Sequence, residues 1–367
     1  YDELIRIRHQ IATNAGFDGY QHYMFAAMHR FDYSIEHCLE FHDSIEAVCQ
    51  PLRHKTDAER KQALGVESLR PWDMGVDVKG RPPLTPFTDV QDMIDGCSRI
   101  FHSMSDELGN LFDQLDANDC LDLESRKGKA PGGYQYYLQK SRLPFIFMNA
   151  AGTQRNVETM IHEAGHAFHS FYSGHLDLIH ERDSPIEFAE VASMSMELLT
   201  HPQWTEFYSE QDAHRARRNH LEDIIALMPW IATIDAFQHW IYANPEHTRE
   251  ERVEKWLELG ERFGSHLDYE GLDHIHELSW QRQGHLFGVP FYYVEYGIAQ
   301  LGALQMWQYH RRDSSNALAR YKAGLALGYT RGLTELFDAS GLALSFSEEH
   351  VSGIIAEIES ALDEIPA

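Results

Sequence analysis

Residues 157–172 read VETMIHEAGHAFHSFY. Apolar positions recur there at steps of three and four residues: Val157, Met160, Ile161, Ala164, Phe168 and Phe171. This spacing predicts a helix with one packed face. On such a helix His162 and His166 lie one turn apart, where two imidazoles can bind one metal ion, and Glu163 can reach a water on that ion. The chain has 23 histidines, so the HExxH spacing alone also fits an ordinary amphipathic helix.

Gly165 interrupts this pattern between the two histidines. A glycine inside a helix costs roughly 1 kcal/mol relative to alanine. We therefore expect a packing or functional reason for it, namely the close approach of another backbone segment.

A third metal ligand is expected from residues 186–199, IEFAEVASMSMELL, which carry Glu187, Glu190 and Glu197. Helical spacing brings these carboxylates toward one side of an otherwise apolar segment, where a buried acid needs a partner. Catalytic zinc takes three protein ligands, and two histidines with one glutamate are a known set. We predict Glu190 as the third ligand, Glu197 as the acid that orients a ligand histidine, and Glu187 as the alternative ligand.

His169 competes with Glu190 because it follows His166 by three residues. One straight helix does not readily place three ligands around a tetrahedral ion. We therefore expect His169 to be a hydrogen-bonded wall residue rather than a ligand.

Residues 285–297, HLFGVPFYYVEYG, carry a histidine followed by three tyrosines. Amide hydrolysis develops a negatively charged oxygen that needs neutral hydrogen-bond donors. His285, Tyr292 and Tyr296 are candidates, since the two tyrosines would share one face of a helix while Tyr293 points elsewhere. Aromatic core packing is the alternative interpretation.

Composition narrows the class of protein. The chain has 367 residues, 43% of them hydrophobic, which is enough for a large core. Its net charge of −26 argues against nucleic acid as a partner. No apolar run approaches 18 residues, so we expect no membrane span. The four cysteines form no CxxC pair and are interpreted as reduced buried thiols: Cys38, Cys49, Cys97 and Cys120.

The pattern of the whole chain predicts a mainly α fold with one small β-sheet beside the metal-binding helix. Amphipathic helices are expected over residues 1–65, with breaks near 14–16 and at Gln50-Pro51. A Pro/Gly-rich connector follows to residue 86, then a long helix capped by Thr88 and running to Leu115. Strands are expected at 134–138 and 144–148. We divide the chain into a helical segment with its connector, 1–86, and a catalytic region, 87–367.

Several motifs together resemble the M3 family of zinc metallopeptidases, in the branch of oligoendopeptidase F and Pz-peptidase. They are LRPWD at 69–73, GKAPGGY at 128–134, PFIFMN at 144–149, HEAGHAFH at 162–169, FAEVASM at 188–194 and HLFGVPFYYVEYGIAQ at 285–300. Members of this family are typically longer at the N-terminus, by a helical region that we expect to be absent from this chain. The resemblance implies a two-lobed helical zincin-type fold and a cytoplasmic enzyme that acts on short peptides.

By motif match, the resemblance also implies site residues. His162, His166 and Glu190 correspond to the ligands of Zn²⁺, and Glu163 corresponds to the general base. His285 corresponds to the intermediate-stabilising histidine, together with one or more of three tyrosines: Tyr292, Tyr293 and Tyr296.

The sequence thus predicts a zinc endopeptidase in which Glu163 activates a metal-bound water, while the edge of the small sheet, 145–151, pairs with an extended peptide substrate. One alternative is a zinc carboxypeptidase of similar helical build. It would need a cation for the terminal carboxylate, and the candidates are Arg142, Arg155 and Arg282. A second alternative is a non-catalytic peptide-binding module, although such a module has no use for Glu163.

Overall fold

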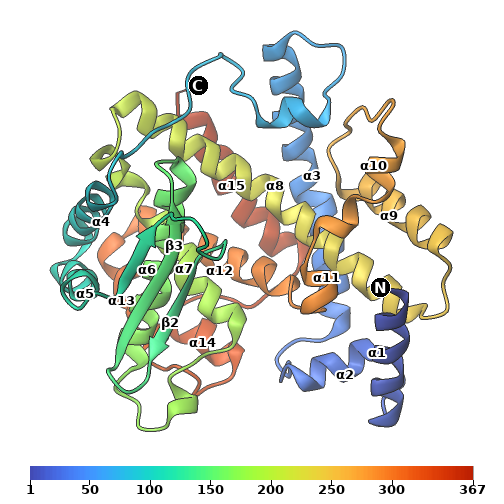
Figure 1. Cartoon of the computed structure of the whole chain (residues 1–367), viewed down its shortest axis with the longest axis horizontal. Helices are drawn as coiled ribbons and strands as arrows, with labels where there is room; N and C mark the ends of the chain where they lie inside the picture. The colour runs from blue at the N-terminus through green and yellow to red at the C-terminus, as the bar shows by residue number, and fades with distance from the viewer. Residues whose placement is uncertain (367) are drawn as a thin grey trace. The chain divides into compact units, whose positions relative to one another are not determined.

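The computed structural model describes residues 1–366, and within them it is mainly α-helical with a single three-stranded sheet (Figure 1). The mainly α fold with one small sheet, predicted from the sequence, is therefore confirmed. The chain divides into two compact units. Unit 1 comprises Tyr1–Pro82, Leu221–Gly297 and Ser345–Glu359, and unit 2 comprises Pro83–His220, Ile298–Leu344 and Ser360–Ala367.

These units are not sequential, unlike the predicted division at residue 86. The first crossing falls after Pro82, close to that position, but the chain later returns to unit 1 for residues 221–297. The chain passes from one unit to the other within long helices. Three of them contribute residues to both units: α8 (Glu210–Ala243), α12 (Val294–Arg312) and α15 (Glu348–Glu364).

The described residues of unit 1 form helices and loops and no strand. Besides its share of the three long helices it contains α1 (Asp2–Asn14), α2 (Tyr20–Ala27), α3 (Ile35–Leu64), α9 (Arg249–Phe263), α10 (Asp273–Glu277), α11 (His285–Gly288) and the 3-10 turns η1 (Pro71–Gly75) and η4 (Ser279–Arg282). The predicted break at Gln50-Pro51 is wrong, because α3 continues through Pro51. Ile45, Cys49 and Leu52 are buried on that helix, and burial of this face offsets the proline penalty of about 3 kcal/mol.

Unit 2 contains the sheet and the helices that cover it. These elements are α4 (Val90–Met104), α5 (Asp106–Ala117), β1 (Leu121–Glu124), β2 (Tyr134–Leu138), β3 (Leu143–Ala150), α6 (Gln154–Ser173), α7 (Ile186–Leu199), α13 (Ser314–Leu325), α14 (Leu333–Ala339) and the 3-10 turns η2 (Ile179–Glu181) and η3 (His201–Glu206). In Figure 1, α6 lies behind β2 and β3, against which it packs.

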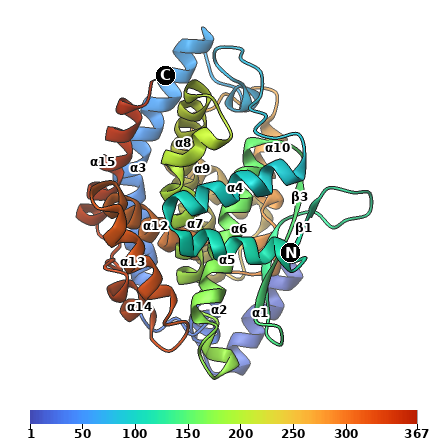
Figure 2. The same cartoon turned by 90° about the vertical axis from the view of Figure 1, so that its left-hand side faces the viewer.

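Helices α4 and α5 pack side by side where one long helix was predicted (Figure 2). The chain becomes extended at Ser105 (φ −168°, ψ 129°), which ends α4 and starts α5. The predicted cap at Thr88 is also wrong by one residue, because the carboxylate of Asp89 accepts the hydrogen bond from the backbone N–H of Gln91. Phe101 of α4 contacts both Phe112 of α5 and Phe168 of α6, with ring centroids 5.0 and 4.9 Å apart. These rings join the helix pair to α6.

The sheet has the order β1-β3-β2, so β3 is its central strand. β3 pairs in parallel with β1 and antiparallel with β2. Both predicted strands are present, and β1 is an addition that the sequence did not reveal. The expectation that residues 145–151 form a sheet edge for substrate is wrong for most of that segment, since Ile146 and Phe147 are paired on both sides.

Two predictions about buried segments can be compared with the structure. All four cysteines of the chain lie among the described residues as buried thiols, as predicted.

Helix α8 is long and apolar enough to cross a membrane by length and composition, although no unbroken apolar run of that length is present. Because 72% of its most apolar window is buried within the fold, α8 has the properties of a core helix.

Candidate functional site

Helix α6 positions the HExxH residues and packs unusually close to α7. A Cβ atom built on Gly165 would lie 2.6 Å from the Cα of Ser193 and 2.8 Å from the carbonyl oxygen of Ala192, both on α7. Atoms that close cannot coexist without a shift of one backbone. The expectation that Gly165 allows the close approach of a second backbone is therefore confirmed.

This close packing brings His162, His166 and Glu190 together, and we call these three residues the α6–α7 cluster. One potential ligand atom from each lies within 4.8 Å of the others. Oε2 of Glu190 is 3.4 Å from Nε2 of His162 and 3.8 Å from Nε2 of His166. Two imidazole nitrogens and a carboxylate oxygen are the donor set of many catalytic zinc sites. The residues present therefore fit a zinc ion, and their assignment as ligands stays a prediction.

Glu197 lies about two turns of α7 beyond Glu190 and contacts the other ring nitrogen of His162. Its Oε1 is 2.6 Å from Nδ1 of His162, which can donate a hydrogen bond to it. That bond leaves Nε2 of the neutral imidazole with its lone pair on the side of Glu190. The arrangement matches the orienting role predicted for Glu197, and such carboxylate partners fix the ring position of ligand histidines.

Two further histidines continue this chain of contacts. The second carboxylate oxygen of Glu197 lies 2.9 Å from Nε2 of His220, and Nδ1 of His220 lies 2.8 Å from Nε2 of His201. Sequence reasoning missed both residues. His220 lies on α8, far from Glu197 in the sequence, and His201 follows Glu197 by four residues but belongs to η3, because α7 ends at Leu199. They link the α6–α7 cluster to the buried interior of unit 2.

Glu163 is the buried acid beside the two histidines. Its exposure is 6%, and its Oε2 has no hydrogen-bond partner among the described residues. Burial raises the pKa of Glu163 to about 7, and the neighbouring Glu190 and Glu197 carboxylates act in the same direction, while His162 opposes them. A carboxyl group with its pKa near neutrality can both accept and return a proton.

The two histidines of the cluster have opposite electrostatic environments. Burial alone would lower the pKa of His162, but its contacts with Glu190 and Glu197 hold that pKa well above the usual value. Burial lowers the pKa of His166 to about 4. The cluster therefore attracts positive charge to one imidazole and keeps the other neutral, which is the state that binds a metal.

Two residues considered as ligands lie on these helices but outside the cluster. His169 is buried against Phe188, with ring centroids 6.0 Å apart, and its Nε2 has no hydrogen-bond partner among the described residues. The expected hydrogen bond at this atom is therefore not present, because Phe188 of α7 packs against the ring, and burial lowers the pKa of His169 to about 3. Glu187 is buried on α7, and its role as the alternative ligand stays a prediction.

His285 and the three tyrosines form a separate aromatic group within unit 1. The ring of His285 lies 4.9 Å from that of Tyr293 and 5.9 Å from those of Tyr292 and Tyr296. The predicted shared helix face is wrong in detail, because α12 begins at Val294, so Tyr292 and Tyr293 precede the helix. The turn before α12 brings all three tyrosines against His285, including Tyr293, which a continuous helix would have directed elsewhere.

A strained residue sets the path of this turn. Phe291 has a φ of +66°, which is the left-handed region that bulky residues rarely adopt. The side-chain oxygen of Gln238 accepts a hydrogen bond of 2.6 Å from its backbone N–H, and the guanidinium of Arg30 donates to its carbonyl. Arg30 also forms a buried ion pair of 2.6 Å with Glu295. These contacts hold the tyrosine segment in its conformation.

Comparison with known proteins shows which protein family the chain matches. The model of peptidase family M3 matches residues 1–354. Oligopeptidase PepF of Bacillus subtilis (strain 168) is 23% identical over 322 residues, covering 86% of this chain and 47% of that protein. An oligoendopeptidase F homolog of Borreliella burgdorferi is 24% identical over 301 residues, covering 78% of this chain and 49% of that protein. The chain thus spans about half the length of these curated relatives.

Solved structures give the same result. A structure described as Pz peptidase A with an inhibitor matches with a TM-score of 0.93 and 32% identity, over 100% of this chain and 65% of that one. A structure described as a putative oligoendopeptidase F matches with a TM-score of 0.91 and 33% identity, over 100% of this chain and 64% of that one. Together with the family model, these matches confirm the family resemblance seen in the sequence motifs. The chain belongs to peptidase family M3.

Proposed function

We propose that this chain carries the catalytic centre of a zinc-dependent endopeptidase that hydrolyses short peptides. The observation that supports this proposal most strongly is the meeting of His162, His166 and Glu190 next to a buried acid, Glu163, whose Oε2 has no partner among the described residues. Membership in the peptidase family and relatives named as oligopeptidases support the same reaction class.

His162, His166 and Glu190 would hold the metal, with Glu197 keeping His162 in its binding orientation. When bound, a zinc ion supplies Lewis acidity, which lowers the pKa of water and polarises the peptide carbonyl. The side chains of His162 and His166 retain 23% and 17% of their exposure, whereas that of Glu190 retains 8%. Solvent and substrate can therefore reach the histidine side of this cluster.

Glu163 would be the general base. It takes the proton from the attacking water and passes it to the nitrogen of the leaving amine when the peptide bond breaks. A pKa near 7 suits both transfers, because the same carboxyl group must be a carboxylate before the first and an acid before the second.

His285, Tyr292, Tyr293 and Tyr296 would donate hydrogen bonds to the negatively charged oxygen of the tetrahedral intermediate. Burial lowers the pKa of His285 and raises that of Tyr293. Both residues are therefore neutral near pH 7, and a neutral tyrosine can donate its hydroxyl proton.

The three arginines considered for a carboxypeptidase each have another contact. Arg142 donates to the carbonyl of Gly174, Arg155 lies 3.4 Å from Glu158, and the guanidinium of Arg282 lies 4.9 Å from the ring centroid of Trp230. A substrate carboxylate would have to compete with these partners, so we favour the endopeptidase.

The deciding experiment uses an internally quenched short peptide blocked at both termini. Wild-type protein loaded with zinc should cleave it, and Glu163→Gln should retain its metal while kcat falls by roughly 10²- to 10⁴-fold. The matched control is Glu158→Gln, since Glu158 is also a buried acid of α6 but contacts Gln154 and Arg155 instead.

Three outcomes would contradict the proposal in different ways. Cleavage of only the peptide with an open C-terminus would identify a carboxypeptidase. Binding of the peptide without cleavage by the wild-type protein would identify a peptide-binding module. Equal turnover by Glu163→Gln and wild type would remove Glu163 from its assigned role.

A further inference from the structure

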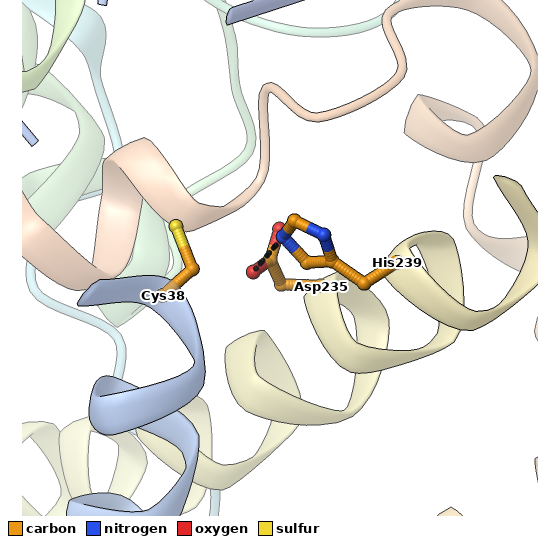
Figure 3. Close-up of side chains that lie close together, drawn as sticks. All are labelled: Cys38, Asp235 and His239. Atoms are coloured by element: carbon orange, nitrogen blue, oxygen red, sulfur yellow. Dashed lines mark ion pairs between the residues drawn. The ribbon is translucent and has the colours of Figure 1, made fainter. Parts of the chain in front are cut away.

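A second group of potential metal ligands lies between α3 and α8 in unit 1, and we call it the α3–α8 cluster. Its members are Cys38 and His42 on α3, and Asp235 and His239 on α8. Each pair is four residues apart and so shares a helix face. One potential ligand atom each from Cys38, Asp235 and His239 lies within 4.8 Å of the others (Figure 3). Nε2 of His42 lies 2.9 Å from Oδ2 of Asp235.

The cluster is sealed from solvent. The side chains of His42, Asp235 and His239 have exposures of 2%, 0% and 7%, and Cys38 is fully buried. A buried carboxylate requires compensation for the hydration it has lost. Yet Oδ1 of Asp235 has no hydrogen-bond partner among the described residues, although the whole side chain is buried.

The contacts of His239 suit a neighbouring cation. Its Nδ1 lies 3.2 Å from the side-chain oxygen of Gln21, an acceptor, so Nδ1 carries the proton in the neutral ring. Nε2 then presents a lone pair, and it lies 3.4 Å from Oδ2 of Asp235 without forming a hydrogen bond. Two acceptors face each other at this distance in a fully buried site. A positive charge between them would turn this unfavourable contact into a favourable one.

A proton on one of the imidazoles can supply this charge in the metal-free protein. A metal ion supplies the charge without protonating a ring. It also uses the lone pairs of Nε2 and of both carboxylate oxygens, as well as the sulfur of Cys38.

The α6–α7 cluster has the same local geometry. There, Nδ1 of His162 contacts Glu197 and Nε2 lies 3.4 Å from a carboxylate oxygen of Glu190. In the α3–α8 cluster, the outer nitrogen of His239 contacts Gln21 and the inner one lies 3.4 Å from a carboxylate oxygen of Asp235. In both places, an outer partner orients the ring and leaves the inner nitrogen available to a cation.

We propose that Cys38, Asp235 and His239, with His42 as the fourth ligand, form a second metal site that binds a divalent ion of the zinc class. Thiolate, imidazole and carboxylate donors are typical of tetrahedral zinc. Donor atoms around such an ion lie roughly 3.3–3.8 Å apart, so the atoms of Cys38, Asp235 and His239, now within 4.8 Å of one another, would close by roughly 1 Å through side-chain rotation. On binding, the thiol of Cys38 loses its proton to solvent.

This site would join two helices rather than catalyse a reaction. Its four ligands occupy all the tetrahedral positions, as in structural zinc sites, and no solvent reaches them. The ion would tie α3, near the start of the chain, to α8, about two hundred residues later. The proposal does not depend on the reaction assigned to the α6–α7 cluster.

Cobalt substitution tests this site separately from the α6–α7 cluster. A Co²⁺–thiolate bond gives a charge-transfer band in the near ultraviolet, and the donors of the α6–α7 cluster include no sulfur. Protein produced in cobalt-supplemented medium, so that Co²⁺ is present during folding, should show this band. Cys38→Ser should abolish it, and the matched control Cys49→Ser, at a buried cysteine of the same helix, should retain it.

Metal content gives a second measurement, which does not require a Cys38 variant that folds. The double variant His162→Ala/His166→Ala should keep one equivalent of metal, together with the cobalt–thiolate band. Wild-type protein without the band, a band that survives Cys38→Ser, or no metal in the double variant would each overturn the proposal. In those cases the α3–α8 cluster is a polar network that binds no metal.

Discussion

The two histidine clusters of this molecule use the same local design but differ in exposure. In each, an imidazole nitrogen lies 3.4 Å from a carboxylate oxygen, which belongs to the neighbouring helix in the α6–α7 cluster and to the same helix in the α3–α8 cluster. His162 and His166 keep 23% and 17% of their side-chain exposure, whereas His42 and His239 keep 2% and 7%. The first cluster is therefore open to solvent, whereas the second is buried.

This difference teaches which feature separates a reactive centre from a structural one. The α6–α7 cluster has three donors and a nearby acid, Glu163, that is not itself one of them. In the α3–α8 cluster three potential donors lie close together, His42 is the proposed fourth ligand, and no such additional acid is among its members. Donor chemistry alone does not distinguish the two; the open position and the spare acid do.

The largest expected effect concerns the α6–α7 cluster. Glu190→Gln replaces an anionic ligand with a neutral amide, so the protein should lose its active-site metal. A metal contributes several kcal/mol of transition-state stabilisation, so kcat/KM should fall by on the order of 10³-fold. Activity and metal content measured together check this, with Glu158→Gln as the control. Unchanged metal content would show that another residue completes the site.

The pH dependence of stability should have opposite signs in the two clusters of the metal-free protein. Burial raises the pKa of Glu163 to about 7 from its ordinary value of 4.5, so its contribution to stability is present below pH 4.5 and is lost as pH rises toward 7. The change is roughly 3 kcal/mol at 1.36 kcal/mol per pKa unit. Although burial opposes it, contact with His239 and His42 lowers the pKa of Asp235, so its contribution is lost as pH falls.

Melting temperatures from pH 4.5 to 8 would measure this contrast in chelator-treated protein. Glu163→Gln should flatten the decline of stability between pH 4.5 and 7, because a glutamine does not ionise. Asp235→Asn should leave that decline in place. If the wild-type slope persisted in Glu163→Gln, another group would be responsible for it.

A smaller effect is expected one contact away from the metal ligands. Glu197→Gln weakens the hydrogen bond that orients His162, and the loss of such a partner typically lowers metal affinity by about 10- to 100-fold. Competition with a chelator of known affinity measures it. Affinity equal to that of the wild type would mean that packing alone orients His162.

The smallest effect concerns the backbone contact between α6 and α7 at Gly165, which brings the residues of the α6–α7 cluster together. Gly165→Ala introduces a Cβ 2.6 Å from the Cα of Ser193, and overpacking of this kind costs about 1–3 kcal/mol. Chemical denaturation checks the loss of stability. The control is Gly353→Ala on α15, where a Cβ would meet nothing within 4 Å and helix propensity favours alanine by about 1 kcal/mol. Equal effects of the two variants would contradict the close contact between α6 and α7.

Local sequence patterns predicted local structure well where one face of a helix or strand is buried. The apolar spacing around His162 and His166 predicted α6, and the run of small and apolar residues around Glu190 predicted α7. The same reasoning failed at Pro51 and at Ser105. At Pro51, burial of the α3 face outweighs a local helix breaker, and at Ser105 a backbone change ends a helix that periodicity alone would continue.

The sequence by itself determined that two imidazoles face one way on one helix and that a carboxylate follows on the next, because helical geometry fixes the positions of residues three or four apart. Only the tertiary structure decided that Glu197 meets His220, that the turn after Phe291 gathers the tyrosines, and that Cys38 approaches Asp235. Those contacts join residues far apart in the chain. Their distances depend on how whole helices pack, and no local periodicity encodes that packing.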